Sequence, residues 1–169
     1  MRILIIIFLL FISTPSSAIE ITNFKSGLAC TNSKLTKDGT GWICQPTIEV
    51  LVTDQGRCVY NGKTNFCTWV GYEFDFKAEK ELTKIQCNTT FSKPLSLGNP
   101  ENVTDEEVTS QDYELELKGK SGHFYNPQYF IFDTRPNHNL PLAVATTCKV
   151  SDKVVFQYHF NIKFPTLDN

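Results

Sequence analysis

The sequence lacks the excess of basic residues that proteins binding nucleic acid need. Lys and Arg together number 16 against 18 Asp and Glu, and the formal net charge is −2. Contact with a polyphosphate backbone, or with an anionic membrane surface, depends on a positively charged face. We therefore expect no nucleic acid among the partners of this protein.

Long apolar runs are also absent, apart from one at the N-terminus. Met1 and Arg2 precede an unbroken apolar run over residues 3–12, and small or turn-forming residues then lead to Ala18. As a helix that run rises about 15 Å, about half of a hydrocarbon core of about 30 Å. The pattern is typical of a cleaved signal peptide. We predict cleavage before Ile19, a single domain over residues 19–169 with no membrane span, and a periplasmic or secreted location.

The cysteines lack the close spacing of metal sites. All six follow the leader and none forms a Cys-x-x-Cys pair, which zinc sites favour. An even number in an exported chain indicates disulfides, although the sequence alone leaves several pairings open. The preferred set is Cys30–Cys44, Cys58–Cys67 and Cys87–Cys148. The second pair has the best support because a turn signal lies between its two members.

Helical periodicity is missing too, and period-two alternation takes its place. In residues 153–164, aromatic and branched side chains occupy one parity and mostly polar side chains occupy the other. Side chains alternate between the two faces of a strand, so this segment is a long strand with one face in the core. Similar runs predict further strands at residues 19–25, 47–53, 57–60, 69–76, 83–91, 112–118, 129–133 and 142–150.

These runs are separated by turn signals. Asn61-Gly62 is the strongest, because both residue types tolerate the positive φ of a hairpin turn. Residues 97–107 are polar and predict a surface loop with or without a helical turn, and residues 135–139 predict another loop. The whole pattern indicates an all-β fold, an antiparallel β-sandwich (Ig-like or related) of seven to nine strands stapled by disulfides. A small barrel is the alternative.

The sequence contains no motif for catalysis. There is no Gly-x-Ser-x-Gly elbow, no phosphate-binding glycine loop and no EF-hand loop, so we predict no catalytic residue, no metal ligand and no cofactor. The acidic group Glu101, Asp105, Glu106 and Glu107 is interpreted as a solvated face rather than a calcium site. An enzyme with a dispersed site around Asp133, Arg135, His138 and His159 remains an alternative hypothesis, which requires these side chains to converge.

Aromatic residues concentrate in residues 123–132. Phe124 and Tyr125 would form a recognition surface if they were exposed, because aromatic side chains anchor interfaces. The favoured interpretation is that they cover the core. Asn88 and Asn102 begin glycosylation sequons, which matter only in a eukaryotic source.

Several short motifs carry a resemblance to a known family. Gly41-Trp42-Ile43-Cys44, then residues 58–63 and Cys67-Thr68-Trp69, with residues 97–100, resemble exported proteins of the Legionella enhanced-entry B type over residues 42–100. The resemblance implies an exported bacterial protein linked to host-cell entry, with no catalytic residue to carry over.

Three functions are compatible with this sequence. The first is a non-enzymatic module of the bacterial envelope that contacts a protein partner. The second is an inhibitor or immunity protein against a secreted hydrolase or toxin, in which a loop fixed by Cys58–Cys67 loses little entropy on binding. The third is the dispersed-site enzyme.

Overall fold

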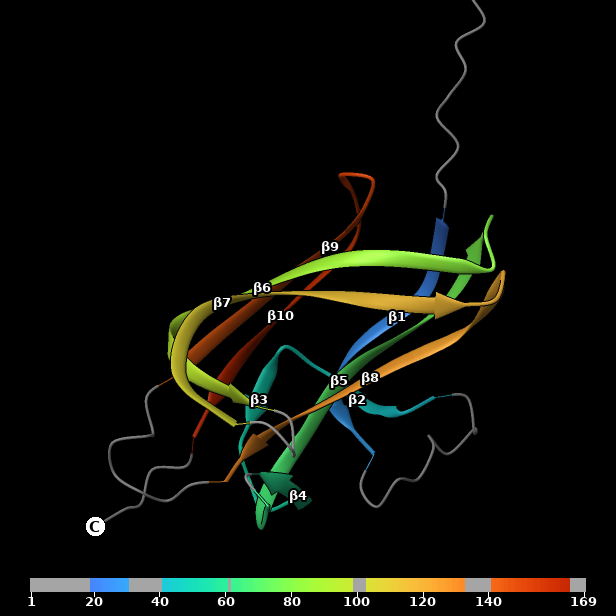
Figure 1. Ribbon diagram of the computed structural model, residues 1–169. Helices are drawn as coiled ribbons and strands as arrows, with labels where there is room; N and C mark the ends of the chain where they lie inside the picture. Colours follow the sequence, from blue (N-terminus) through green and yellow to red (C-terminus); the bar gives the residue numbers. More distant parts are fainter. Residues whose placement is uncertain (1–18, 31–40, 61, 99–102, 133–140, 165–169) are drawn as a thin grey trace, which may run out of the picture.

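The computed structural model describes residues 19–30, 41–60, 62–98, 103–132 and 141–164. The predicted signal peptide lies outside these residues. Within them the chain forms ten strands and no helix, and so no helix that could cross a membrane. The strands build two five-stranded sheets that face each other, as Figure 1 shows.

The first sheet is built around one long strand. Its members are β1 (Ile19–Ala29), β2 (Ile43–Pro46), β4 (Gly56–Tyr60), β5 (Lys63–Ala78) and β8 (Ser121–Ile131). One edge of β5 pairs first with β4 and then with β1, and its other edge pairs with β8. β2 adds to the outer edge of β1. Since β5 is central, β8 brings a segment far away in sequence next to Trp69 and Glu73.

The second sheet has the order β3-β10-β9-β6-β7. Its members are β3 (Glu49–Leu51), β6 (Leu82–Gly98), β7 (Val103–Lys118), β9 (Leu142–Val150) and β10 (Lys153–Lys163). All pairings are antiparallel except that of β3 with β10, which is parallel. The all-β sandwich is therefore confirmed, with one parallel pairing that the sequence analysis did not predict.

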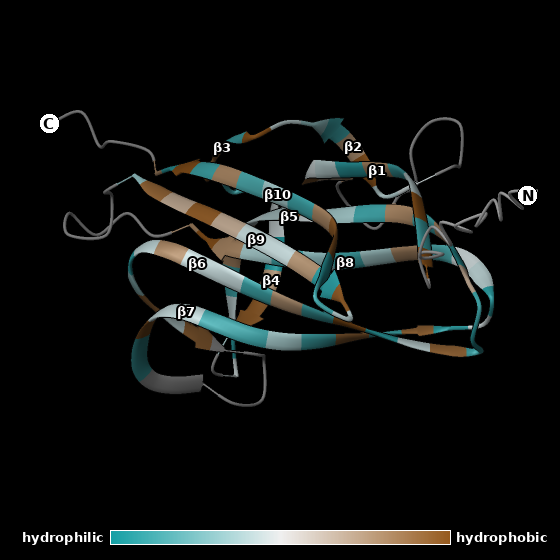
Figure 2. Ribbon diagram, turned by 90° about the horizontal axis from the view of Figure 1, so that it is seen from above, coloured by the Kyte–Doolittle hydropathy of each residue, from teal (hydrophilic) through white to brown (hydrophobic). Residues whose placement is uncertain are grey.

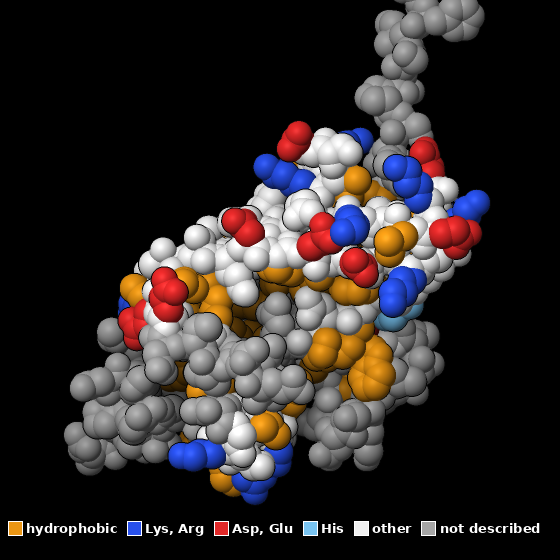
Figure 3. Space-filling model, in the orientation of Figure 1, with side chains coloured by type: hydrophobic (Ala, Val, Ile, Leu, Met, Phe, Trp, Pro, Cys, Tyr) orange, Lys and Arg blue, Asp and Glu red, His pale blue; other side chains and the backbone are white. Residues whose placement is uncertain are grey.

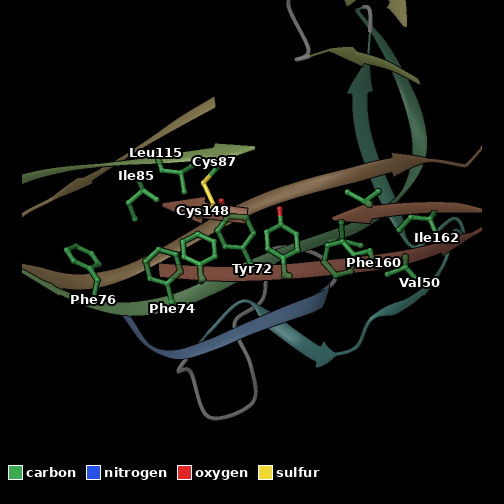
Figure 4. Packing of buried hydrophobic residues seen from close by; sticks show 14 of the residues in the cluster. Val50, Tyr72, Phe74, Phe76, Ile85, Cys87, Leu115, Cys148, Phe160 and Ile162 are labelled. Atoms are coloured by element: carbon green, nitrogen blue, oxygen red, sulfur yellow. A yellow bond between two sulfur atoms is a disulfide. The ribbon is translucent and has the colours of Figure 1, made fainter. Parts of the chain in front are cut away.

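Aromatic and branched side chains of both sheets form a shared core. Val70, Tyr72, Phe74 and Phe76 of β5 are buried, and they lie on the parity that the sequence predicted. The same holds on β10, whose core positions are Phe156, Tyr158, Phe160 and Ile162. Figure 2 shows the alternation of polar and apolar residues along the strands, and Figure 4 shows the buried rows meeting between the sheets. Burial of such side chains contributes about 1.5–3 kcal/mol each.

The disulfides have the preferred pairing. Cys30–Cys44 joins the end of β1 to β2, and Cys58–Cys67 crosses the β4–β5 hairpin. Cys87–Cys148 joins two directly opposed residues of β6 and β9 inside the core. At the predicted hairpin turn, Tyr60 pairs with Lys63 and Gly62 has a φ of 67°, whereas Asn61 lies outside the described residues.

Several predictions about elements were wrong. The predicted range of seven to nine strands becomes ten, because β2 spans only four residues and shows no alternation. Within the predicted loop at residues 97–107, the described residues 97–98 and 103–107 are strand, since β7 begins at Val103 and pairs with Gly98 of β6. Backbone hydrogen bonds form this ladder whatever the side chains, so a polar composition did not reveal it.

Two residues predicted to face the core are exposed instead. Ile48 is 46% exposed, whereas Val50 and Val52 are buried, because β3 is a short edge strand that begins only at Glu49. Val154 is 45% exposed, because the register of β10 against β9 shifts between Val154 and Phe156. A register shift of one residue turns side chains to the other face.

Candidate functional site

The outer face of the first sheet, which points away from the core, carries a group of aromatic side chains. Trp69 of β5 lies directly opposite Tyr129 of β8, and Glu73 lies opposite Tyr125. Trp42 joins them from the segment before β2. We call Trp42, Trp69, Tyr125 and Tyr129 the aromatic face, and all four are half-buried. Figure 3 shows hydrophobic side chains over the part of the molecule where β2, β5 and β8 run.

The rings of the aromatic face are held in pairs. Trp42 stacks on Tyr125 with ring centroids 5.3 Å apart and planes 10° from parallel. Trp69 meets Tyr129 edge to face at 5.2 Å. The Trp69 Nε1–H donates to the carbonyl oxygen of Arg57 at 3.1 Å, and the Tyr129 hydroxyl donates to that of Val59 at 2.7 Å. These contacts fix the rings and tie β8 to the β4–β5 hairpin.

A hollow of about 610 Å³ opens beside these rings. Its walls include Trp42, Trp69, Tyr125 and Pro127, together with Asp54 and Arg57. The guanidinium carbon of Arg57 lies 3.5 Å from the centroid of the Phe66 ring, a cation–π contact that orients the charge. The site therefore combines apolar ring surfaces with one carboxylate and one guanidinium.

Gln55 forms part of the frame of the hollow. Its amide nitrogen donates to the carbonyl oxygen of Ala29 at 3.0 Å, and its amide oxygen accepts the backbone N–H of Trp69 at 2.9 Å. Because both ends of the amide are engaged, Gln55 joins the turn after β3 to β1 and β5.

Beneath the aromatic face lies Glu73, whose side chain is only 1% exposed. Its Oε2 accepts the backbone N–H of Trp42 at 2.5 Å and lies 3.4 Å from Nε2 of His123. Its Oε1 lies 3.7 Å from Nζ of Lys25 and has no hydrogen bond within the part of the chain that the structure describes. A Cβ at Gly41 would lie 2.2 Å from Oε1, so any larger residue there would displace the carboxylate from its present position.

A second carboxylate continues this network toward solvent. Asp75 accepts a hydrogen bond from the side chain of Asn23 at 2.7 Å and contacts Nδ1 of His123 at 2.8 Å. These side-chain hydrogen bonds lower the pKa of Asp75. Burial, with a smaller effect from the charge of Glu73, raises the pKa of Tyr125. The chain of contacts thus connects the surface to the buried Glu73 and the Trp42–Tyr125 stack.

The structure separates the two residues that the sequence singled out for interaction. Phe124 points inward, where its ring lies 5.2 Å from that of Phe74 and 6.3 Å from that of Tyr72. Tyr125 points outward and stacks on Trp42. The interpretation that both cover the core therefore holds for Phe124 and is wrong for Tyr125, because neighbouring residues of a strand face opposite sides.

Other predicted residues do not gather at this site. His159 is exposed on β10, as its polar parity predicted, and Glu106, Glu107 and Asn88 are also exposed. No group of metal-binding side chains occurs in the described residues. The remaining candidates fall outside those residues or have undescribed side chains, and they are Glu101, Asn102, Asp105, Asp133, Arg135 and His138.

The sequence analysis missed several residues of the site. Trp42 was noted only within a short motif, Trp69 within a motif and a predicted strand, and Arg57 only within a predicted strand. Asp54 was not singled out. Glu73 lies on the polar parity of β5, which predicts a solvated side chain, and no pattern in the sequence shows that the Gly41–Trp42 backbone covers it.

Comparison with known proteins found similarity among solved structures. No protein-family model and no curated protein matches this sequence. Among solved structures, the chain is similar to the crystal structure of an immunoglobulin-like protein from Pseudomonas aeruginosa. The two share 13% sequence identity with a TM-score of 0.43, and the match covers 89% of this chain and 100% of that chain.

Proposed function

We propose that this protein is an exported, non-enzymatic binding protein of the bacterial envelope that contacts a partner protein through the aromatic face. The observation that carries the proposal is the hollow beside the Trp42–Tyr125 stack, where aromatic rings, a carboxylate and a guanidinium converge on the outside of a sheet. Aromatic and Arg side chains are the residues that most often dominate binding energy at interfaces.

The rigidity of the surroundings supports this role. Cys30–Cys44 holds the segment that carries Trp42, and Cys58–Cys67 holds the hairpin that carries Arg57. Glu73 adds a hydrogen bond from below to the backbone of Trp42. A surface that is ordered before binding loses less conformational entropy when a partner arrives, so more of the contact energy appears as affinity.

The sequence supports an exported bacterial setting. Six cysteines in three disulfides suit an oxidising compartment outside the cytosol, and the apolar leader suits export. The resemblance of residues 42–100 to enhanced-entry B proteins is consistent with a role at the contact between bacterium and host.

Affinity capture with surface variants tests the proposal. The protein is purified from cells that express the full-length chain, immobilised, and exposed to native envelope and host-membrane extracts. We expect a partner whose affinity falls about tenfold or more in Tyr125→Ala. Gln157→Ala, at an exposed position on the second sheet, serves as the matched control and should bind like the wild type. Equal capture by both variants, or no specific capture at all, would contradict the proposal.

The β4–β5 hairpin favours inhibition of a secreted hydrolase as a second candidate. This hairpin lies at one end of the molecule in Figure 1, and Val59 and Phe66 on it are each 43% exposed. A disulfide-clamped hairpin with exposed apolar side chains is suited to enter a catalytic cleft. We expect inhibition of one member of a panel of cell-wall hydrolases, lost in Phe66→Ala. A panel without any inhibition would remove this candidate.

A further inference from the structure

The hollow beside the aromatic face is large enough to hold a small ligand. Its volume of about 610 Å³ lies within the range typical of pockets that hold small organic ligands. We propose that this hollow binds a carbohydrate, so that the partner is recognised through a glycan. The inference rests on the proposed function, because it assigns a ligand class to the same face.

The rings of the hollow provide apolar surface of the right kind. One side of a pyranose ring presents several C–H groups and no hydroxyl, and such a surface packs on the face of an aromatic ring and leaves water. Trp42, Trp69 and Tyr125 all line the hollow. Their stacking partners and hydrogen bonds hold them in place without a ligand, so little ordering is required when a sugar binds.

The polar groups of the hollow distinguish a sugar from a purely apolar ligand. Asp54 and Arg57 are both exposed and line it, and neither forms an ion pair within the described ranges of the chain. A carboxylate accepts hydrogen bonds from hydroxyl groups, and a guanidinium donates hydrogen bonds to hydroxyl oxygens. A polyhydroxylated ligand can form hydrogen bonds with both groups, whereas the side chain of an aliphatic or proline anchor of a peptide offers a hydrogen bond to neither.

The charges that border the hollow restrict the class of ligand further. One negative and one positive side chain border the same hollow, so a ligand with several charges of one sign would meet repulsion from one of them. Neutral hydroxyl groups meet no such penalty. A hexose-based glycan has this chemistry, because each sugar ring presents an apolar face and is surrounded by neutral hydroxyl groups.

Intrinsic fluorescence provides a direct test, because the only two tryptophans of the chain, Trp42 and Trp69, both line the hollow. The protein, purified from cells that express the full-length chain, is first screened on an array of bacterial and host oligosaccharides. The oligosaccharides that bind best are then titrated into the protein as free sugars. We expect a saturable change in tryptophan emission and an affinity that falls about tenfold in Asp54→Ala and in Tyr125→Ala. Asp112→Ala, on the exposed side of β7, is the matched control and should bind like the wild type. Because Asp54 is exposed, we expect Asp54→Ala to fold normally, so a loss of affinity in this variant is not explained by unfolding.

Two additional experiments distinguish a polysaccharide ligand from a glycan attached to a protein. Free polysaccharide that competes with the array ligand indicates a polysaccharide, and loss of capture after deglycosylation of a glycoprotein partner indicates a protein-linked glycan. Absence of any array signal and of any emission change at millimolar sugar overturns the inference. If capture of a protein partner then still depends on Tyr125 and survives deglycosylation, the proposed function stands and the contact is with polypeptide.

Discussion

Glu73 is a carboxylate kept out of water on the outside of a sheet, because the backbone of Gly41 and Trp42 passes over it. Glu73→Ala leaves the Trp42 N–H without its acceptor, and we expect the free energy of unfolding to fall by about 1–3 kcal/mol. Glu73→Gln retains a side-chain oxygen that can accept this bond and should cost less. Urea unfolding followed by fluorescence measures both. Glu116→Ala, at an exposed position, is the control, and equal losses in the Ala and Gln variants would contradict this role.

Single residues were predictable where strand parity decides their surroundings. Tyr72 and Phe160 are buried as the alternation predicted. Glu73 shares the parity of solvated residues, yet it is buried by a segment that the Cys30–Cys44 disulfide brings over the sheet. Phe124 and Tyr125 illustrate the same point, because only the position of β8 beside β5 shows what each of them contacts.

At the scale of strands and hairpins, two disulfides differ in the length of chain that they close. Cys87–Cys148 spans 61 residues of sequence, and Cys58–Cys67 spans 9. Since closing a longer loop restricts the unfolded chain more, replacing both cysteines of the first pair with Ala should cost about 2 kcal/mol more than replacing both of the second. Urea unfolding of the two double variants measures the difference. A larger loss for the Cys58–Cys67 variant would show that the hairpin disulfide acts mainly within the folded state.

Long strands gave a clear pattern in the sequence, whereas the bounds of the shortest strands depended on their partners, and β2 was missed altogether. β9 begins and ends at the predicted residues, because nine alternating residues give a clear pattern. β2 spans four residues, which is too short for a pattern, and β3 is shorter than the strand predicted at residues 47–53. The pairing of both depends on β1 and β10 from elsewhere in the chain. β7 begins in a polar segment, where backbone pairing with β6 decides the structure.

For the molecule as a whole, two buried tyrosines predict how stability depends on pH. Burial raises the pKa of Tyr72 and Tyr158 well above the ordinary value of 10.0. Below this value both states hold these protons, and no pH dependence arises. Above it the unfolded chain releases protons that the folded chain keeps, so the free energy of unfolding falls as pH rises.

Denaturant unfolding across the alkaline range measures this slope. Tyr158→Phe removes one of the two groups, so the slope should become shallower by about 1.4 kcal/mol per pH unit. His159→Ala, at the exposed neighbouring position, is the control. An unchanged slope in Tyr158→Phe would show that this hydroxyl does not govern alkaline unfolding.

The redox state of the molecule is a further prediction at this scale. All six cysteines are paired, so thiol titration of the native protein should find no reactive group, and reduction in denaturant should release six. Several reactive thiols in the native protein would contradict both the predicted export and the three disulfides of the sandwich.

The sequence by itself determined the all-β class, the core parity of the long strands and the capacity for three disulfides. These properties depend on local alternation and on residue type, which a chain carries wherever it folds. The tertiary structure alone decided that Trp42, Asp54, Arg57, Trp69 and Tyr125 border one hollow and that Glu73 lies buried beneath the aromatic face. These residues come from different strands and connecting segments, and their meeting depends on pairings between distant parts of the chain that no local pattern encodes.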